Sequence, residues 1–269
     1  MNSLQNIKCY ILDMDGTFYL GNNILPGSLD LIEYLKDSGR DFLFLTNNSS
    51  KDAAYYAAKL EKMGLACSLT DILTSGEATV RYLKTIHDKA RVYVLGTPEL
   101  EAEFTHSGFL LTPDKPDYVV LGFDMTLTYD KLVTACNLVR AGVPFIATHP
   151  DINCPTEDGF IPDCGAMIKL IHASTGVLPK IIGKPNREIV DAAFERKQYQ
   201  PEEIAIVGDR LYTDIATGVN AGTRTILVLS GETKAGDIES STVRPDYVFD
   251  GLQDLLANLK SLDNHLKDS

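Results

Sequence analysis

Residues 9–20, CYILDMDGTFYL, start as an apolar run and then present two acidic side chains. The apolar part predicts a buried strand, and Asp13 and Asp15 follow it directly, with Gly16 and Thr17 after them. A buried strand should not end in two carboxylates unless something compensates their charge. The stretch therefore raises two questions: what the two acids do, and what neutralises them.

Two other apolar runs also end in small polar clusters. Residues 42–48 read FLFLTNN, and residues 204–214 read IAIVGDRLYTD. Short apolar runs alternate with segments of helical periodicity along most of the chain, which is typical of an α/β fold with a Rossmann-like, doubly wound parallel sheet. Ligands bind at the carboxyl ends of the strands in such sheets, so we expect the three clusters to converge.

The middle of the chain follows the same rhythm without such polar clusters. The strands expected between residues 92 and 147 end in no comparable set of acid, threonine and lysine. We interpret them as a separate α/β cap domain inserted into the core. The expected division is a first part of the core at 1–78, the cap at 79–179 and a second part of the core at 180–269.

Composition and charge narrow the class of protein. The chain has 269 residues and a net charge of −12, so its overall field repels nucleic acid and anionic membranes. Five cysteines without a CxxC pair indicate reduced thiols, and no secretory signal or membrane-spanning stretch is evident. We expect a cytoplasmic protein, a monomer or a homodimer, whose partner is a small molecule. Zinc on Cys154, Cys164 and His149 is disfavoured by the loose spacing.

The carboxylates at the strand ends predict a cation. Asp13, Asp15, Asp209 and Asp214 would repel one another around one point unless a cation lies among them, and hard oxygen ligands suit Mg²⁺. Asp13, fixed at the strand end, is the candidate nucleophile towards phosphorus, forming an acyl phosphate. Asp15 is the candidate general acid and base. The backbone N–H groups of Gly16 and the next residue could form a small anion site.

Phosphoryl transfer also needs groups that bind the phosphate oxygens. Thr46, with the amides of Asn47 and Asn48, and Lys184 in the GKP segment are the candidates. Each part of the set admits a simpler interpretation. The DxDGT stretch could be a turn at a strand end, Thr46, Asn47 and Asn48 could be the N-terminal cap region of the helix expected at 51–63, and Lys184 could be a solvated surface lysine. Asp214 could likewise only cap the helix that follows it. The complete ordered set, however, suits one reaction.

This ordered set resembles the haloacid dehalogenase (HAD) superfamily of phosphatases, and in particular its NagD-type, or 4-nitrophenylphosphatase-like, branch. The resemblance implies that Asp13 is the nucleophile and Asp15 the acid and base. It implies Mg²⁺ held by the side chains of Asp13 and Asp209 and the backbone carbonyl of Asp15. Asp214 would act through water or hydrogen bonds, or by orienting Lys184. The branch carries a large α/β cap after its second motif, as inferred above.

One position departs from the pattern of the branch. Relatives often have asparagine where this chain has His149, so His149 could affect the choice of substrate. The simpler interpretation is an ordinary histidine of a surface loop. Residues 149–159 appear irregular from their proline, aspartate and glycine content, and residues 151–166, DINCPTEDGFIPDCGA, are a candidate specificity loop.

The sequence thus predicts a Mg²⁺-dependent hydrolase of small phosphomonoesters such as sugar phosphates, nucleotides or 4-nitrophenyl phosphate. A phosphotransferase using the same aspartyl-phosphate is one alternative. A non-enzymatic, receiver-like phosphoacceptor is another, but such a switch lacks an acid two residues after the acceptor, so Asp15 argues against it. The cap insertion argues against it as well.

Overall fold

The computed structural model describes residues 4–156 and 159–267, and the chain divides into two compact units. Unit 1 consists of Met1–Leu45, Ala57–Ile72 and Ala193–Ser269, and unit 2 consists of Thr46–Tyr56 and Leu73–Ala192. Each unit contains a parallel sheet with helices, so the predicted α/β fold with an inserted second unit is confirmed. The exact cap boundaries at 79 and 179 stay a prediction.

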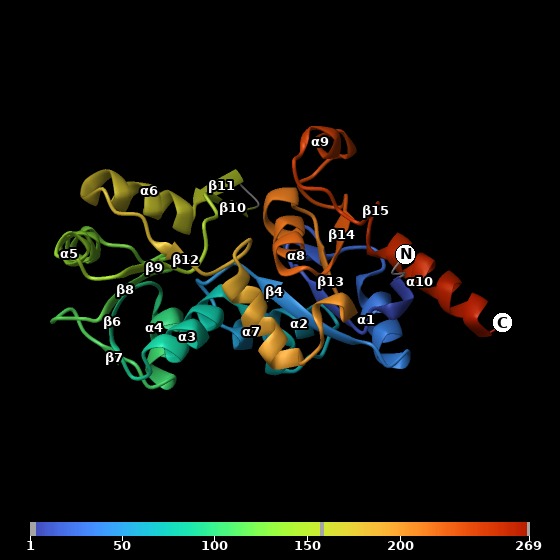
Figure 1. The fold of residues 1–269 in the computed structure, drawn as a ribbon, viewed down its shortest axis with the longest axis horizontal. Coiled ribbons are helices and arrows are strands. Elements are labelled where there is room, and N and C mark those ends of the chain that lie inside the picture. Colours follow the sequence, from blue (N-terminus) through green and yellow to red (C-terminus); the bar gives the residue numbers. More distant parts are fainter. Residues whose placement is uncertain (1–3, 157–158, 268–269) are drawn as a thin grey trace. The chain divides into compact units, whose positions relative to one another are not determined.

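A six-stranded sheet that belongs mostly to unit 1 has the order β15-β14-β13-β1-β4-β5, and Figure 1 labels β4, β13, β14 and β15 of it. β1 lies at its centre, where Cys9 pairs in parallel with Ile204 on one side and with Asp41 on the other. All four residues of β1 are buried, as expected of a strand covered on both faces. The strands are β1 (Cys9–Leu12), β4 (Asp41–Thr46), β5 (Ile72–Thr74), β13 (Ile204–Gly208), β14 (Arg224–Val228) and β15 (Tyr247–Phe249).

Unit 1 also contains helices and a small hairpin, and α2 and α7 belong partly to each unit. α1 forms where Leu31, Ile32 and Leu35 recur on one buried face, and Arg40 after it makes a bidentate contact of 2.7 Å with Asp263 of α10. The hairpin β2–β3, helix α9 and strand β15 were not anticipated. The elements are β2 (Tyr19–Leu20), β3 (Asn23–Ile24), α1 (Ser28–Asp37), α2 (Ala53–Lys62), α7 (Arg187–Lys197), α8 (Ala216–Ala221), α9 (Ala235–Ser240) and α10 (Leu252–Lys267).

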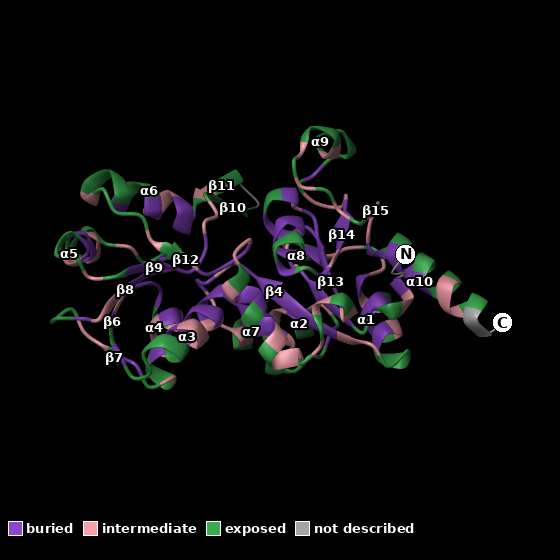
Figure 2. Ribbon diagram, in the orientation of Figure 1, coloured by how far each residue is buried: buried purple, intermediate pink, exposed green. Residues whose placement is uncertain are grey.

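Unit 2 contains a five-stranded sheet in the order β12-β9-β8-β6-β7. Its core gathers Val119, Leu121, Phe123 and Phe145, all buried. In Figure 2 buried residues are purple and exposed residues are green, and the helices of this unit show green along much of their length. The elements are β6 (Arg91–Leu95), β7 (Leu110–Leu111), β8 (Tyr118–Leu121), β9 (Phe145–Ala147), β12 (Lys180–Ile181), α3 (Ser75–Ile86), α4 (Pro98–His106), α5 (Tyr129–Arg140) and α6 (Cys164–Thr175).

The candidate specificity loop is more regular than its composition suggested. β10 (Asn153–Thr156) and β11 (Gly159–Pro162) pair as an antiparallel hairpin, with Asn153 opposite Pro162. The expectation of an irregular stretch at 149–159 is therefore confirmed for 149–152 and wrong for 153–156 and 159, while residues 157–158 lie outside the described part. Phe160 projects from the hairpin with 76% of its surface exposed. In the ranges that the structure describes, no helix is long and apolar enough to cross a membrane.

Candidate active site

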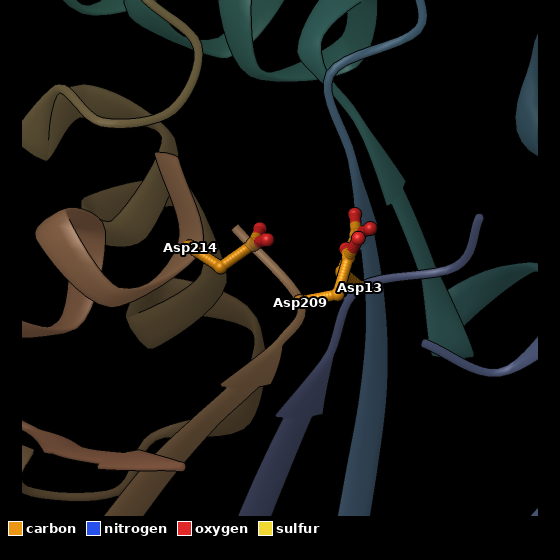
Figure 3. Close-up of side chains that lie close together, drawn as sticks. All are labelled: Asp13, Asp209 and Asp214. Carbon is orange, nitrogen blue, oxygen red and sulfur yellow. The ribbon is translucent and has the colours of Figure 1, made fainter. Parts of the chain in front are cut away.

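Three carboxylates of unit 1 gather at the ends of β1 and β13. Asp13 follows β1, Asp209 follows β13, and Asp214 lies in the π-helical turn Leu211–Ile215. One oxygen of each carboxylate lies within 4.8 Å of the others. Figure 3 shows the Asp214 carboxylate directed towards the other two. Since only 2% of Asp209 and 1% of Asp214 are exposed, this is a largely desolvated acidic cluster.

The Asp209 side chain is held by the backbone around it. Its Oδ2 accepts a hydrogen bond of 2.7 Å from the N–H of Glu232, and its Oδ1 lies 3.4 Å from the hydroxyl of Thr17. Gly16 and Gly231 leave room for this carboxylate, because a Cβ atom on either would lie 2.6 or 2.0 Å from Asp209 Oδ2. Gly231 and Glu232 follow a different strand, β14, and were not predicted as site residues.

Asp214 is held just as closely. Its Oδ2 accepts a hydrogen bond of 3.1 Å from the N–H of Arg210. A Cβ atom at Gly208 would lie 2.2 Å from the Cβ of Asp214, so the last residue of β13 must be small here. Ile215, rather than Asp214, precedes α8, and no side chain caps that helix. The simpler interpretation of Asp214 as a helix cap is therefore wrong.

Arg210 places a positive charge beside the acids. Its Nε lies 2.9 Å from Glu232 Oε2. Burial alone would lower the pKa of Arg210, but Tyr212 and the carboxylates of Asp13 and Asp209 outweigh it and raise this pKa above its usual value. One guanidinium does not balance three clustered carboxylates. The cluster offers several hard oxygen atoms at short mutual distances, which is the donor set that a divalent cation needs.

Asp15 differs from its neighbours in its electrostatic surroundings. Burial raises the pKa of Asp15, while the charge of Lys59 and a hydrogen bond from Gly21 act in the opposite sense, and the pKa stays above its usual value. A carboxyl group that retains its proton more readily suits a general acid. The N–H of Gly16 donates to the carbonyl of Tyr19 at 2.8 Å, so the expectation that this N–H is free to bind an anion is wrong.

The four candidate phosphate-binding residues, Thr46, Asn47, Asn48 and Lys184, all belong to unit 2. The Asn47 side chain brackets the backbone of Lys184: its Oδ1 accepts from the Lys184 N–H at 2.8 Å, and its Nδ2 donates to the Lys184 carbonyl at 3.1 Å. Lys184 is 3% exposed, so the interpretation as a solvated surface lysine is wrong. Asn47 thus positions Lys184.

Thr46 and Asn48 stabilise the turn after β4. The hydroxyl of Thr46 accepts a hydrogen bond of 3.2 Å from the Asn48 N–H. Asn48 Oδ1 accepts from both the N–H and the hydroxyl of Ser50, at 2.9 and 2.8 Å. The helix that follows begins only at Ala53, and Asp52 Oδ1 accepts the Tyr55 N–H at its start, so the interpretation of Thr46, Asn47 and Asn48 as its cap region is wrong. The binding role of these residues stays a prediction.

His149 lies in the interior. None of its surface is exposed, and its ring faces Asp151 and Asp163. The interpretation as an ordinary histidine of a surface loop is therefore wrong.

Two families of known proteins match parts of this chain. Residues 10–110 match the haloacid dehalogenase-like hydrolase family, and residues 181–255 match a second family described as HAD-hydrolase-like. An acid sugar phosphatase of Staphylococcus saprophyticus is 38% identical over 258 residues, which are 96% of this chain and 100% of that protein. The chain belongs to the haloacid dehalogenase-like hydrolases. This HAD-like hydrolase also resembles several solved structures.

Two solved structures are similar over nearly the whole chain. A 4-nitrophenylphosphatase from Thermotoga maritima has a TM-score of 0.92 and 47% identity, covering 94% of this chain and 98% of its own. A glycerol phosphate phosphatase from Mycobacterium tuberculosis, in complex with calcium, has a TM-score of 0.87 and 31% identity, covering 93% of this chain and 75% of its own. The predicted superfamily, its 4-nitrophenylphosphatase-like branch and the class of enzyme, a HAD-type phosphatase, are confirmed.

Proposed function

We propose that this HAD-like hydrolase is a Mg²⁺-dependent phosphatase that hydrolyses small phosphomonoesters through an aspartyl-phosphate on Asp13. The observation that supports this most is the cluster of Asp13, Asp209 and Asp214, in which one oxygen of each carboxylate lies within 4.8 Å of the others. Such a cluster is costly without a cation. The order of the motifs along the chain supports the same reaction.

The donor set fits a hard divalent cation. The carboxylates of Asp13 and Asp209 and the backbone carbonyl of Asp15 would hold it, with Asp214 acting through a water molecule or hydrogen bonds. When bound, Mg²⁺ supplies positive charge that offsets the carboxylates and the phosphoryl oxygens. Thr17 and the Glu232 N–H orient Asp209 for this role.

The reaction proceeds in two displacements at phosphorus. In the first, an oxygen of Asp13 forms a bond to phosphorus while the bond to the ester oxygen breaks, and Asp15 gives its proton to the leaving alkoxide. In the second, Asp15 takes a proton from water, whose oxygen attacks phosphorus, and the bond to Asp13 breaks. Inorganic phosphate leaves, and both carboxyl groups regain their starting states.

The remaining groups bind the phosphate. We assign to Lys184 a compact positive charge for the phosphate oxygens, and to Thr46 and the amides of Asn47 and Asn48 hydrogen-bond donation. Sugar phosphates are the first substrate class to test, because the relative from Staphylococcus saprophyticus is named an acid sugar phosphatase. Glycerol phosphate and 4-nitrophenyl phosphate follow from the names of the two solved relatives.

The decisive experiment measures phosphate release from a panel of these esters with Mg²⁺ and with EDTA. We expect release that requires the metal, and a radiolabelled phosphoenzyme that survives acid quenching. Release at an unchanged rate in EDTA would overturn the metal requirement. If the metal-loaded enzyme releases no phosphate but labels an added alcohol, the protein is a phosphotransferase instead.

A further inference from the structure

His149 stands between two carboxylates in the interior of unit 2. Its Nδ1 lies 3.6 Å from Asp151 Oδ2, and its Nε2 lies 3.4 Å from Asp163 Oδ1. Within residues 4–156 and 159–267, neither ring nitrogen has a hydrogen-bond partner of ordinary geometry. The two carboxylates are therefore the polar groups that the two nitrogens face.

This arrangement favours a charged ring. A neutral imidazole carries one N–H and one lone pair, so one of its nitrogens would present a lone pair to a carboxylate. An imidazolium presents an N–H to each. The side chains of Asp151 and Asp163 are only 13% and 6% exposed, so water compensates little of their charge.

The other ionisable groups around the ring do not change this conclusion. They are Asp151, Asp163, Lys184 and the thiol of Cys164. Burial disfavours the charged ring and Lys184 repels it, but the two carboxylates outweigh both and raise the pKa of His149 above 6.5. Burial raises the pKa of Cys164 to about 12, so this thiol is neutral.

The two carboxylates belong to residues at the two ends of one hairpin. Asp151 lies just before β10, and Asp163 lies just after β11. The backbone closes the same base, since the Asp163 N–H donates to the Ile152 carbonyl at 2.9 Å. Asp163 Oδ1 also accepts the N–H of Cys164 at 2.6 Å, at the start of α6. His149 therefore faces the hairpin at the two points where its strands enter and leave.

A second set of contacts leads from the hairpin to Lys184. Both oxygens of Asp151 lie 3.2 Å from Nδ2 of Asn47. The same amide group brackets the backbone N–H and carbonyl of Lys184. A shift of Asp151 would release Nδ2 of Asn47 from one of its acceptors and loosen the position of Lys184.

We propose that His149 is a positioning residue: as an imidazolium between Asp151 and Asp163, it fixes the base of the β10–β11 hairpin and, through Asn47, the placement of Lys184. All the residues that surround the charged ring belong to unit 2. The kinetic consequence rests on the proposed function, in which Lys184 binds phosphate. The effect expected first is on KM and on phosphate affinity, because a displaced Lys184 would bind the phosphate group less tightly.

The first test does not depend on activity. NMR of ¹⁵N-histidine-labelled protein reports the protonation of both ring nitrogens, and the signal that disappears in His149→Gln identifies this ring. We expect both nitrogens of His149 to carry protons at pH 8. A neutral His149 ring at pH 8 would overturn the proposal.

The second test separates positioning from folding. We expect His149→Gln to raise both KM and the inhibition constant of inorganic phosphate about tenfold, with kcat within about twofold of the original. His172→Gln is the matched control and should change neither. A His149→Gln variant that stays folded with both constants unaltered would refute the link to Lys184.

A double variant keeps the proposal testable if His149→Gln folds but is too unstable for kinetics. Asp163→Asn removes one carboxylate while asparagine still caps α6. We expect the loss in melting temperature from His149→Gln to be smaller in the Asp163→Asn background, because one buried charge then needs no partner. Strictly additive losses would contradict the ion pair. If the unaltered enzyme hydrolyses no ester, the proposed function fails while the NMR result still decides the state of His149.

Discussion

Replacing Gly208 with alanine tests whether the position of Asp214 matters to the acidic cluster. The new methyl carbon would lie 2.2 Å from the Cβ of Asp214 and 2.3 Å from its Cγ, whereas ordinary contact begins at 3.4 Å. To increase the 2.2 Å distance to 3.4 Å, Asp214 must therefore move away by about 1.2 Å. Gly208 ends a regular strand and has no left-handed φ, so the substitution causes no such backbone strain.

A displacement of this size is large for a catalytic site. Misplacement by about 1 Å can cost on the order of 100-fold in rate, and overpacking costs about 1–3 kcal/mol of stability. We expect Gly208→Ala to lower kcat on the order of 100-fold and to raise the Mg²⁺ concentration at half-maximal activity. Kinetics at a series of Mg²⁺ concentrations, with melting curves, measure both effects.

The control is Gly236→Ala in α9, where a Cβ atom would meet nothing within 4 Å and no left-handed φ is required. This variant should retain the original kcat, Mg²⁺ dependence and melting temperature. Unchanged kcat and Mg²⁺ dependence in folded Gly208→Ala would refute the reasoning. In that case the place of Asp214 beside Asp13 and Asp209 would have no part in catalysis.

Three further changes have defined outcomes. Asp13→Asn should lower kcat on the order of 10⁴-fold or more and abolish the acid-stable phosphoenzyme; labelling at the original level would contradict a nucleophilic Asp13. Asp15→Asn should lower kcat by about 10²–10⁴-fold without weakening Mg²⁺ binding, as titration calorimetry would measure, and lost metal affinity would assign its side chain to the metal instead. Burial would lower the pKa of Lys197, but hydrogen bonds and charge from Asp41 and Asp71 outweigh it and raise this pKa above 10.5. The ion pair therefore stabilises the fold fully below pH 10.5, and this stabilisation is lost as the pH rises through the raised pKa. Lys197→Met should therefore lower the free energy of unfolding, measured with urea at pH 7, by about 1–2 kcal/mol, a range that allows for the exposure of Asp41. The difference from the original protein should shrink above pH 10.5. A difference that stays constant with pH would exclude the ion pair as its cause.

The features that sequence predicted best are those fixed by local pattern. β1 and β13 are apolar runs and β4 is apolar between Asp41 and Thr46, and the polar residues at the ends of these strands are readable without any tertiary information. The grouping of Asp13 with Asp209 follows from the parallel pairing of β1 with β13. The same rule made Asp214 a candidate, although its π-helical turn was not foreseen.

The features that sequence missed depend on contacts between distant residues. Pro155 and Pro162 lie in β10 and β11, and proline normally argues against a strand, so this isolated hairpin appeared irregular. The burial of His149 depends on how the two ends of that hairpin fold back on it. Gly231 touches Asp209 from another loop, and nothing in the sequence around it signals this contact.

The central place of β1 in its sheet also has a consequence for biosynthesis. Cys9 pairs with Ile204, so the strand that carries the nucleophile leaves the ribosome about 195 residues before one of its two neighbours. Because the ribosome adds about 5–20 residues per second, one edge of β1 stays without its partner strand for roughly 10–40 seconds. During this interval the apolar sequence CYIL requires protection from non-native pairing, and a chain truncated before β13 would never receive it from its own sheet.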